Sequence, residues 1–411
     1  MTLWNPVWSI QIDDVEYSNV TLANLTIQSG RTDIYSQAIA GYLNIQLINL
    51  DQSAITAEIN SSITVFLENS AGTPVAIFGG SITDLLISVN SSGAVALTQT
   101  ISIVALGALS RLPKVLTEGV LTQDYDGNQI ATILDGILYG AWNAVPAALT
   151  WAAYNPTANW TQAENSGIGE IDTGNYELTA RSASVATAYD LVSALATSGL
   201  GYLYEDSQGR INYADSTHRG TYLGTYGYTE VSANQAFASG LEIATRAGDV
   251  RNYVTLTYNN GAQVTDSDAT SIALYGKLAQ NIDTSLKHTY DATNQAAFYL
   301  DLRAYPQANF NSIAFPLGSP EIDDADRDAL ISVFMGLPVN VVDLPINMGS
   351  NFQGFVEGWA FQAGYNSLTV SLYLTPIAYS LQAFTWNAVP VVEKWNTINP
   401  TLDWLNATIV A

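Results

Sequence analysis

The sequence predicts a mainly β protein of the α+β class, in which two β domains flank a small α/β insert. Three observations lead to this prediction. Apolar and polar residues alternate through the first 115 residues, the apolar spacing becomes helical near residue 130, and the alternation returns near residue 240. A chain of 411 residues is long enough for two or three domains, each with its own core. The expected segments are 1–115, 116–239, 240–380 and a terminal stretch at 381–411.

Short strands are expected throughout residues 1–115, because turns rich in Gly, Asn and Ser separate the alternating runs. Leu43, Ile45 and Leu47 fall on one face, as a half-buried antiparallel strand requires. This pattern is typical of a β-barrel or a β-sandwich. The expected strands are Ser9–Asp13, Leu22–Ser29, Gly41–Leu47, Ser62–Asn69, Pro74–Val89 and Val95–Leu106.

Helical spacing identifies the insert at 116–239. Its first helix is predicted from positions i, i+3, i+4, i+7 and i+8, which are Ile130, Ile133, Leu134, Ile137 and Leu138. A second helix is predicted near 184–198, with Ser184 as the N-cap and with inward positions Val185, Tyr189, Val192 and Leu195. Two strands are then expected around an acidic turn, at Gly201–Tyr204 and Arg210–Tyr213.

The segment 240–380 returns to strands, with two helices among them. A helix is expected near 291–303, and a shorter one from Asp323 to about Met335, where the acids of the first turn favour the helix dipole without any metal. The expected strands are Gly240–Thr245, Asn252–Asn259, Val339–Val342, Gly354–Ala363 and Ser367–Leu374.

A repeat of Trp and Pro residues occurs twice. Residues 142–160 and 386–404 share the pattern Trp-Asn-Ala-Val-Pro, then Trp, Asn-Pro-Thr and Trp at identical offsets. Indoles nine residues apart fall on opposite faces of a helix or a strand, and the prolines disfavour both elements. Extended straps are therefore predicted at 141–163 and 381–411, with Trp386, Trp395 and Trp404 buried against their own domain or a neighbouring chain.

Charge and composition restrict the class of protein. The chain has 13 basic and 37 acidic residues, a net charge of −24, so stable binding to nucleic acid is not expected, because duplex DNA is held by Lys and Arg. Only 12% of residues are charged, about half the usual ~25%, which favours a subunit of a large assembly or, alternatively, an extracellular β-protein. Cysteine is absent, which excludes disulfides and thiolate chemistry. Neither a signal peptide nor a membrane span is predicted.

Candidate catalytic residues are few. His218 and His288 are both expected to be solvated loop residues, and no nucleophile elbow, phosphate loop or zinc-protease motif occurs. The run Asp124–Asn128 has its Gly too early for an EF-hand and is expected to form a turn or helix cap. Carboxylates for glycoside hydrolysis are conceivable at Glu205, Asp206 and Glu357, but Glu205 and Asp206 are expected in a hairpin turn. No catalytic, cofactor-binding or metal-binding residue is assigned.

Several segments, in this order, resemble the minor tail or baseplate hub proteins of tailed bacteriophages. The resemblance extends over most of residues 1–380. Its segments are Gly30–Asp33, Ala40–Gly41, Leu47–Asn49, Ala105–Leu112, Gly199–Ile211, Asp215–Arg219, Phe355–Trp359 and Leu372–Pro376.

The resemblance implies two β-barrel domains with an α/β insert, assembled as a homotrimeric ring at the tail tip. Its partners would be the tail tube or distal tail protein, the tape-measure protein, and fibre or spike proteins. The ring would form part of the DNA conduit of the virion and would assemble in the host cytoplasm, without enzymatic activity or cofactors. Two alternatives stay open: a receptor- or carbohydrate-binding tail module with an exposed aromatic platform, and a cell-wall hydrolase with paired carboxylates in a cleft.

Overall fold

The structure is a computed structural model. It describes residues 4–17, 20–32, 36–49, 54–89, 99–142, 168–237, 241, 243–245, 247–306, 308–310, 312–349, 351–364, 367–376, 383–384 and 409–410. The strap predictions for Trp386, Trp395 and Trp404, and for nearly all of 141–163, lie outside these residues. Two short strands at the ends of the second strap, β25 and β26, pair with each other, and their bounds are Ala383–Phe384 and Ile409–Val410.

A twelve-stranded sheet dominates the described residues, and seven of its strands come from the N-terminal segment. Every strand expected there is present, with small shifts at the ends. The order is β3-β4-β7-β6-β5-β1-β2, with antiparallel pairing throughout. The bounds are β1 Trp8–Ile12, β2 Val15–Glu16, β3 Val20–Gly30, β4 Ile39–Asn49, β5 Ser62–Glu68, β6 Pro74–Val89 and β7 Gln99–Leu106.

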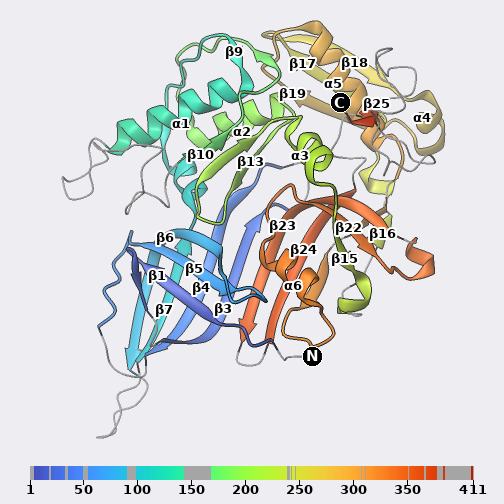
Figure 1. The fold of residues 1–411 in the computed structure, drawn as a ribbon. Coiled ribbons are helices and arrows are strands. Elements are labelled where there is room, and N and C mark those ends of the chain that lie inside the picture. The colour runs from blue at the N-terminus through green and yellow to red at the C-terminus, as the bar shows by residue number, and fades with distance from the viewer. Residues whose placement is uncertain are drawn as a thin grey trace, which may run out of the picture.

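Four strands from the far end of the chain, together with β15 from the end of the segment 116–239, complete the same sheet. Residues Gly358–Ala363 of β23 pair antiparallel with Gly30–Leu25 of β3, so the two β segments lie side by side (Figure 1). The expected β23–β24 hairpin is confirmed. The bounds are β15 Thr229–Ser232, β21 Ile313–Pro316, β22 Pro338–Val342, β23 Phe352–Gly364 and β24 Ser367–Pro376. The predicted mainly β fold class is therefore confirmed.

The alternation predicted for β4 determines which side of the sheet faces the core. Leu43, Ile45 and Leu47 are fully buried, whereas Asn44 and Gln46 between them are exposed. Each buried leucine or isoleucine side chain contributes about 1.5–3 kcal/mol to folding. At these positions β4 therefore has an apolar inner face and an outer face of neutral polar side chains.

The insert packs three helices and several short strands above the sheet (Figure 1). The first predicted helix is confirmed as α1, and Ile130, Ile133, Leu134 and Ile137 are buried. The expected hairpin is confirmed as β13–β14, with β14 also parallel to β10. The bounds are α1 Asp126–Trp142, α2 Ala188–Ser198, α3 His218–Tyr226, β8 Leu116–Thr117, β9 Asp124–Tyr125, β10 Ile168–Ile171, β11 Glu177–Leu178, β12 Ala186–Thr187, β13 Tyr202–Glu205 and β14 Ile211–Ala214.

The start of α2 corrects the prediction for the second helix. Thr187, not Ser184, is the N-cap, and its side chain accepts a hydrogen bond from Asp190 N. Thr187 is also the last residue of β12, which pairs with β8, so the chain stays extended until the helix begins. Val185, predicted to face inward, is consequently 67% exposed. Val192 and Leu195 are buried as expected.

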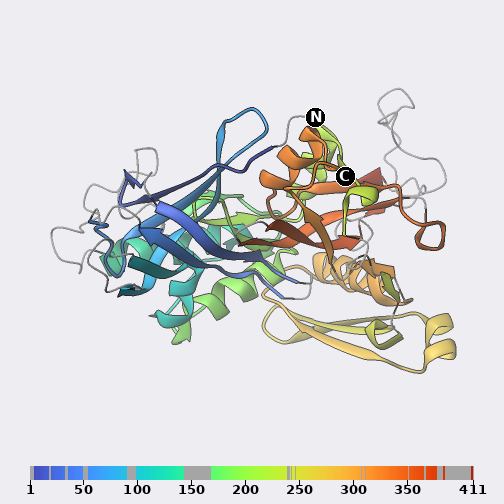
Figure 2. The same ribbon diagram turned by 90° about the horizontal axis from the view of Figure 1, so that it is seen from below.

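A small module at residues 247–306 stands at one side of the molecule (Figure 2). Its sheet has the order β18-β17-β19 and is covered by α5, the helix predicted near 291–303. The helix predicted from Asp323 is α6, for which Asp323 is the N-cap, although it ends at Ile331 rather than near Met335. The bounds are β16 Ile243–Thr245, β17 Tyr253–Tyr258, β18 Ala262–Ser267, α4 Ala269–Tyr275, β19 Ala279–Asp283, α5 Thr289–Arg303, β20 Ala308–Phe310 and α6 Asp324–Ile331. Short 3-10 helices also occur, including η1 at Ala108–Lys114 and η7 at Ile346–Met348.

Candidate functional site

A buried ion triad joins the insert to both β segments. Glu357 on β23 accepts hydrogen bonds from Arg31 Nε at 2.7 Å and from Arg219 Nη1 and Nη2 at 2.7 and 3.0 Å. The side chains of Arg31, Arg219 and Glu357 are 7%, 5% and 0% exposed. Burial favours the neutral acid, but the charges of Arg219 and Arg31 outweigh it and lower the pKa of Glu357 to about 2. Glu357 is therefore an ionised carboxylate held between two cations.

A bulge in β23 and the close approach of β3 place Glu357 in this position. The β23–β24 pairing shifts between Val356 and Gly358, so Glu357 is the extra residue. Gly30 has φ +83°, and a Cβ there would lie 2.3 Å from the carbonyl oxygen of Glu357. Arg31 N donates to that same carbonyl at 2.9 Å. Only glycine at position 30 allows this contact.

Tyr202 of β13 covers the triad from the insert. The guanidinium carbon of Arg219 lies 4.3 Å from the centre of its ring, and that of Arg31 lies 5.5 Å away. Both distances are within the range of cation–π attraction. Arg219 therefore also contacts the β13–β14 hairpin, because Tyr202 is the first residue of β13.

The carboxylate of Glu205, on the insert, forms hydrogen bonds with the first β segment. Glu205, the last residue of β13, accepts hydrogen bonds at 2.6 Å from Gly41 N of β4 and from Leu109 N of η1. The side chain is buried, and this burial raises the pKa of Glu205 to about 8 despite the two N–H donors. The expectation that Glu205 belongs to the hairpin turn is therefore wrong, because Glu205 is still in β13 and pairs with Ile211. The turn begins one residue later, at Asp206, which pairs with Arg210 at 2.7 Å.

A third carboxylate is enclosed within the insert itself. Asp126, the first residue of α1, accepts a hydrogen bond from Tyr176 N at 2.8 Å and a short one from the Tyr213 hydroxyl. Burial raises the pKa of Asp126 to about 6. Its neighbour Asp124, on β9, accepts from Asn128 Nδ2 at 2.9 Å, so the run Asp124–Asn128 consists of a strand and the first residues of α1.

The two histidines differ in their surroundings. His218 is not the solvated loop residue that was predicted, because the Asp215 turn folds it onto Asp172 with an Nδ1–Oδ2 distance of 2.7 Å. The hydrogen bond that His218 donates to the Asp172 carboxylate raises the pKa of His218. His288 precedes α5 and lies 2.6 Å from Glu177, with its side chain 53% exposed, so its predicted place at the surface is confirmed.

The three acids considered for hydrolysis do not meet around a cleft. Glu205 and Glu357 are enclosed by their hydrogen-bond donors, and Asp206 holds Arg210 at the hairpin turn. No group of three or more His, Asp or Glu side chains suited to a metal ion exists among the described residues. In the same part of the chain, no helix is long and apolar enough to cross a membrane.

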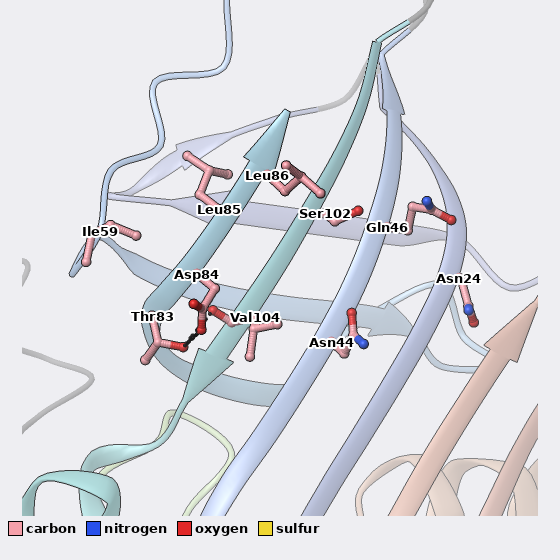
Figure 3. Close-up of a pocket in the computed structure, with 10 residues that line it drawn as sticks. All are labelled: Asn24, Asn44, Gln46, Ile59, Thr83, Asp84, Leu85, Leu86, Ser102 and Val104. Carbon is pink, nitrogen blue, oxygen red and sulfur yellow. Dashed lines mark hydrogen bonds between the residues drawn. The ribbon is translucent and has the colours of Figure 1, made fainter. Parts of the chain in front are cut away.

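An open groove of about 680 Å³ lies on the outer face of the first β segment (Figure 3). Two rows of side chains cross β3, β4, β7 and β6 here, because Gln46 pairs with Asn24 and Ser102, and Asn44 pairs with Val104. Asp84 is the one charged residue of the lining, and no aromatic residue contributes to it. The lining residues are Asn24, Asn44, Gln46, Ile59, Thr83, Asp84, Leu85, Leu86, Ser102 and Val104.

Comparison with solved structures identifies the architecture. A tail protein from Neisseria meningitidis superimposes with a TM-score of 0.59 and 12% identity, and the match covers 92% of this chain and 98% of the other. The chain has the fold of a tail protein. The 43 kDa tail protein of a prophage from Shewanella oneidensis gives a TM-score of 0.54 and 11% identity, over 91% and 98% of the two chains. No family model matches the sequence, and neither does any curated protein.

The shared fold confirms the mainly β, tail-protein-like fold expected from the resemblance. Residues quoted for that resemblance also converge in space, because Arg31, Gly41, Glu205, Arg219 and Glu357 all belong to the buried contacts described above. Both carboxylate oxygens of Glu205 and of Glu357 accept hydrogen bonds in these contacts. Together, these contacts attach the insert to the large sheet.

Proposed function

We propose that the chain is a structural, non-enzymatic component of a phage tail, a hub or tail-tip ring built from three copies. The observation that carries this proposal is the fold that the chain shares with two tail proteins over nine-tenths of its length. Its partners would be the tail tube or distal tail protein, the tape-measure protein and fibre or spike proteins. The ring would form part of the DNA conduit in the virion.

The distribution of basic residues supports a role beside passing DNA. Arg219, Arg303 and Arg327 are buried, and Arg31 is 7% exposed at its side chain, so several of the 13 basic residues cannot reach phosphate groups. The acidic majority stays available at the surface. A wall of neutral and acidic groups repels phosphates, so DNA would pass along such a ring without adhering. Retention of duplex DNA by the purified protein at low salt would contradict this role.

The groove supports contact between copies of the chain. On a chain of net charge −24, most faces repel a second copy, whereas the groove has one carboxylate and several neutral amides. The side chains of Asn24, Asn44 and Gln46 have no hydrogen-bond partner among the residues that the structure describes. Exposed Leu86 and Ile59 add apolar surface at its rim. We therefore place the contact between neighbouring copies on this face.

Light scattering tests the trimer and the face separately. The wild-type protein is expected to have a mass near three times 44.1 kDa. The double variant Asn44→Asp with Gln46→Glu adds two charges that a contact on this face would bury, and it should yield monomers. Gln263→Glu, an exposed change on β18, should leave the trimer intact. A monomeric wild type contradicts the ring, while a trimeric double variant contradicts only the choice of face.

The two alternative functions find less support. A carbohydrate-binding module was expected to show an exposed aromatic platform, and none of the groove residues is aromatic. A hydrolase was expected to show paired carboxylates in a cleft, and the candidate acids Glu205 and Glu357 are enclosed. The strongly exposed aromatic side chains, such as Tyr226 and Tyr290, lie outside this groove.

A further inference from the structure

The module at 247–306 has an exposed apolar corner at the end of helix α4. Leu274 and Tyr275, the last two residues of α4, are 66% and 38% exposed. Lys277 follows two residues later and is also exposed. These three residues are called the α4 corner. Adjacent apolar side chains that the chain itself leaves uncovered are typical of a surface that a partner covers.

The charge of the α4 corner is unusual for this acidic chain. Residues 269–282 contain one charged side chain, that of Lys277, although the whole chain has 37 acids. Lys277 Nζ lies 3.4 Å from the centre of the Tyr253 ring, so cation–π attraction holds the ammonium group beside the corner. Asp268 caps the opposite end of α4, where it accepts a hydrogen bond from Ser271 N. The corner therefore combines apolar surface with one positive charge.

The groove on the outer face of the first β segment has the complementary character. Of its described lining residues, Asp84 is the one that carries a charge, so the lining itself supplies no compensating cation (Figure 3). Leu85, Leu86 and Ile59 contribute apolar surface. A partner that brings a carboxylate into the groove is repelled by Asp84, whereas one that brings a cation and apolar side chains is attracted.

We propose that the α4 corner of one copy of this chain occupies the groove of the next copy, with Lys277 beside Asp84 and Leu274 against Leu86. This inference rests on the proposed function, because it names the second surface of the contact between copies. The two surfaces differ, so the contact is heterologous. Contacts of this kind produce a ring when the rotation between successive copies closes.

The two surfaces lie too far apart to meet within one chain. Strands β3, β4, β7 and β6, which carry the groove, lie at one end of the molecule, and α4 lies at the opposite end in both views (Figures 1 and 2). Contact between the corner and the groove is therefore intermolecular. Each copy has one corner and one groove, so each copy can bind two neighbours, as a ring requires.

A second exposed apolar segment beside a lysine fits the groove less well. Leu116 and Val120 are 68% and 60% exposed, and Lys114 precedes them. Glu118 lies between these two apolar residues and is exposed as well. It would bring a second carboxylate to Asp84, which favours the α4 corner as the occupant.

Disulfide trapping tests the contact directly, because the native chain contains no cysteine. Leu86→Cys combined with Leu274→Cys should form crosslinked trimers under mild oxidation, since a disulfide requires the two positions to be adjacent. Each single variant has one thiol and can form a dimer at most. The matched control combines Leu86→Cys with Tyr290→Cys, an exposed position on α5 of the same module, and should form few crosslinks.

Charge reversal provides a second readout that does not depend on disulfide geometry. Asp84→Lys and Lys277→Asp each place like charges together and should raise the dissociation constant of the trimer at least about tenfold at low salt. The two substitutions in one chain should restore the trimer.

The outcomes separate this inference from the proposed ring. A wild type that is trimeric by light scattering, with no more crosslinking of the Leu86–Leu274 pair than of the control pair, would overturn the inference and leave the ring intact. A double charge variant as weak as either single variant would also overturn it. A monomeric wild type would contradict the ring itself.

Discussion

Removal of the negative charge from the ion triad provides the sharpest test of how the insert is attached. Glu357→Gln keeps the shape of the side chain but leaves Arg31 and Arg219 without a counter-charge, at side-chain exposures of 7% and 5%. It also replaces an acceptor oxygen by an amide that faces guanidinium donors. Three charge-assisted hydrogen bonds are lost or weakened.

The expected cost is large because two cations stay buried. Removal of one partner from a buried ion pair lowers the free energy of unfolding by about 3–5 kcal/mol. The matched control is Asp206→Asn, which neutralises the acid of the Asp206–Arg210 pair, where the side chains are 22% and 31% exposed. An exposed pair of this kind contributes about 0–1 kcal/mol. The two substitutions remove the same charge and differ mainly in burial.

Urea denaturation followed by tyrosine and tryptophan fluorescence measures both variants. Glu357→Gln should lower the urea midpoint strongly and Asp206→Asn only slightly, with similar slopes. The pKa of Glu357 is lowered to about 2, below that of an unfolded glutamate, so its contribution is complete above about pH 4.3 and is lost as the pH falls toward 2. A Glu357→Gln variant within 1 kcal/mol of the control at pH 7 would refute the reasoning.

Two further outcomes are expected from the same contacts. Gly107→Ala should unseat Glu205 and lower the thermal midpoint by several degrees, whereas Gly136→Ala in α1, where a Cβ meets nothing within 4 Å, should raise it slightly. Equal effects of the two alanines would contradict the cradle. His218→Gln should cost about 1 kcal/mol at pH 6 and less at pH 9, because the raised pKa means that its ion pair with Asp172 is present below pH 6.5 and lost as the pH rises through the folded value. A loss of equal size at both pH values would count against this charge effect.

The spacing of apolar residues predicted an element correctly where the residues on its apolar face are also the residues buried in the fold. The alternation of Leu43, Ile45 and Leu47 and the helical spacing of Ile130 and Leu134 both correspond to buried faces. Burial of apolar residues on one face is the main force that selects an element, so the pattern carries the information. The start of α2 was missed because β12 extends the chain to Thr187, and that pairing depends on β8, about 70 residues earlier.

The buried polar contacts could not be predicted from local sequence. Glu205 and Arg219 stand in polar, turn-like surroundings in the chain, which favours solvent exposure. Their burial depends on Gly41, Gly107 and Glu357, which lie roughly 100 to 160 residues away. The one available signal was the set of segments shared with tail proteins, which includes all five residues.

Scarcity of cations explains how the interior of this chain is built. With 13 basic residues for 37 acids, few buried carboxylates can have an arginine, and Glu357 alone among the three described here has two. Glu205 and Asp126 instead accept backbone N–H groups in cradles lined by glycine, where a Cβ at Gly107 or Gly174 would lie 2.0 or 2.3 Å from a carboxylate oxygen. Backbone donors satisfy the hydrogen bonds without supplying a full charge, so both acids have raised pKa values. Glu357, by contrast, keeps its charge because two arginines supply the compensating charges.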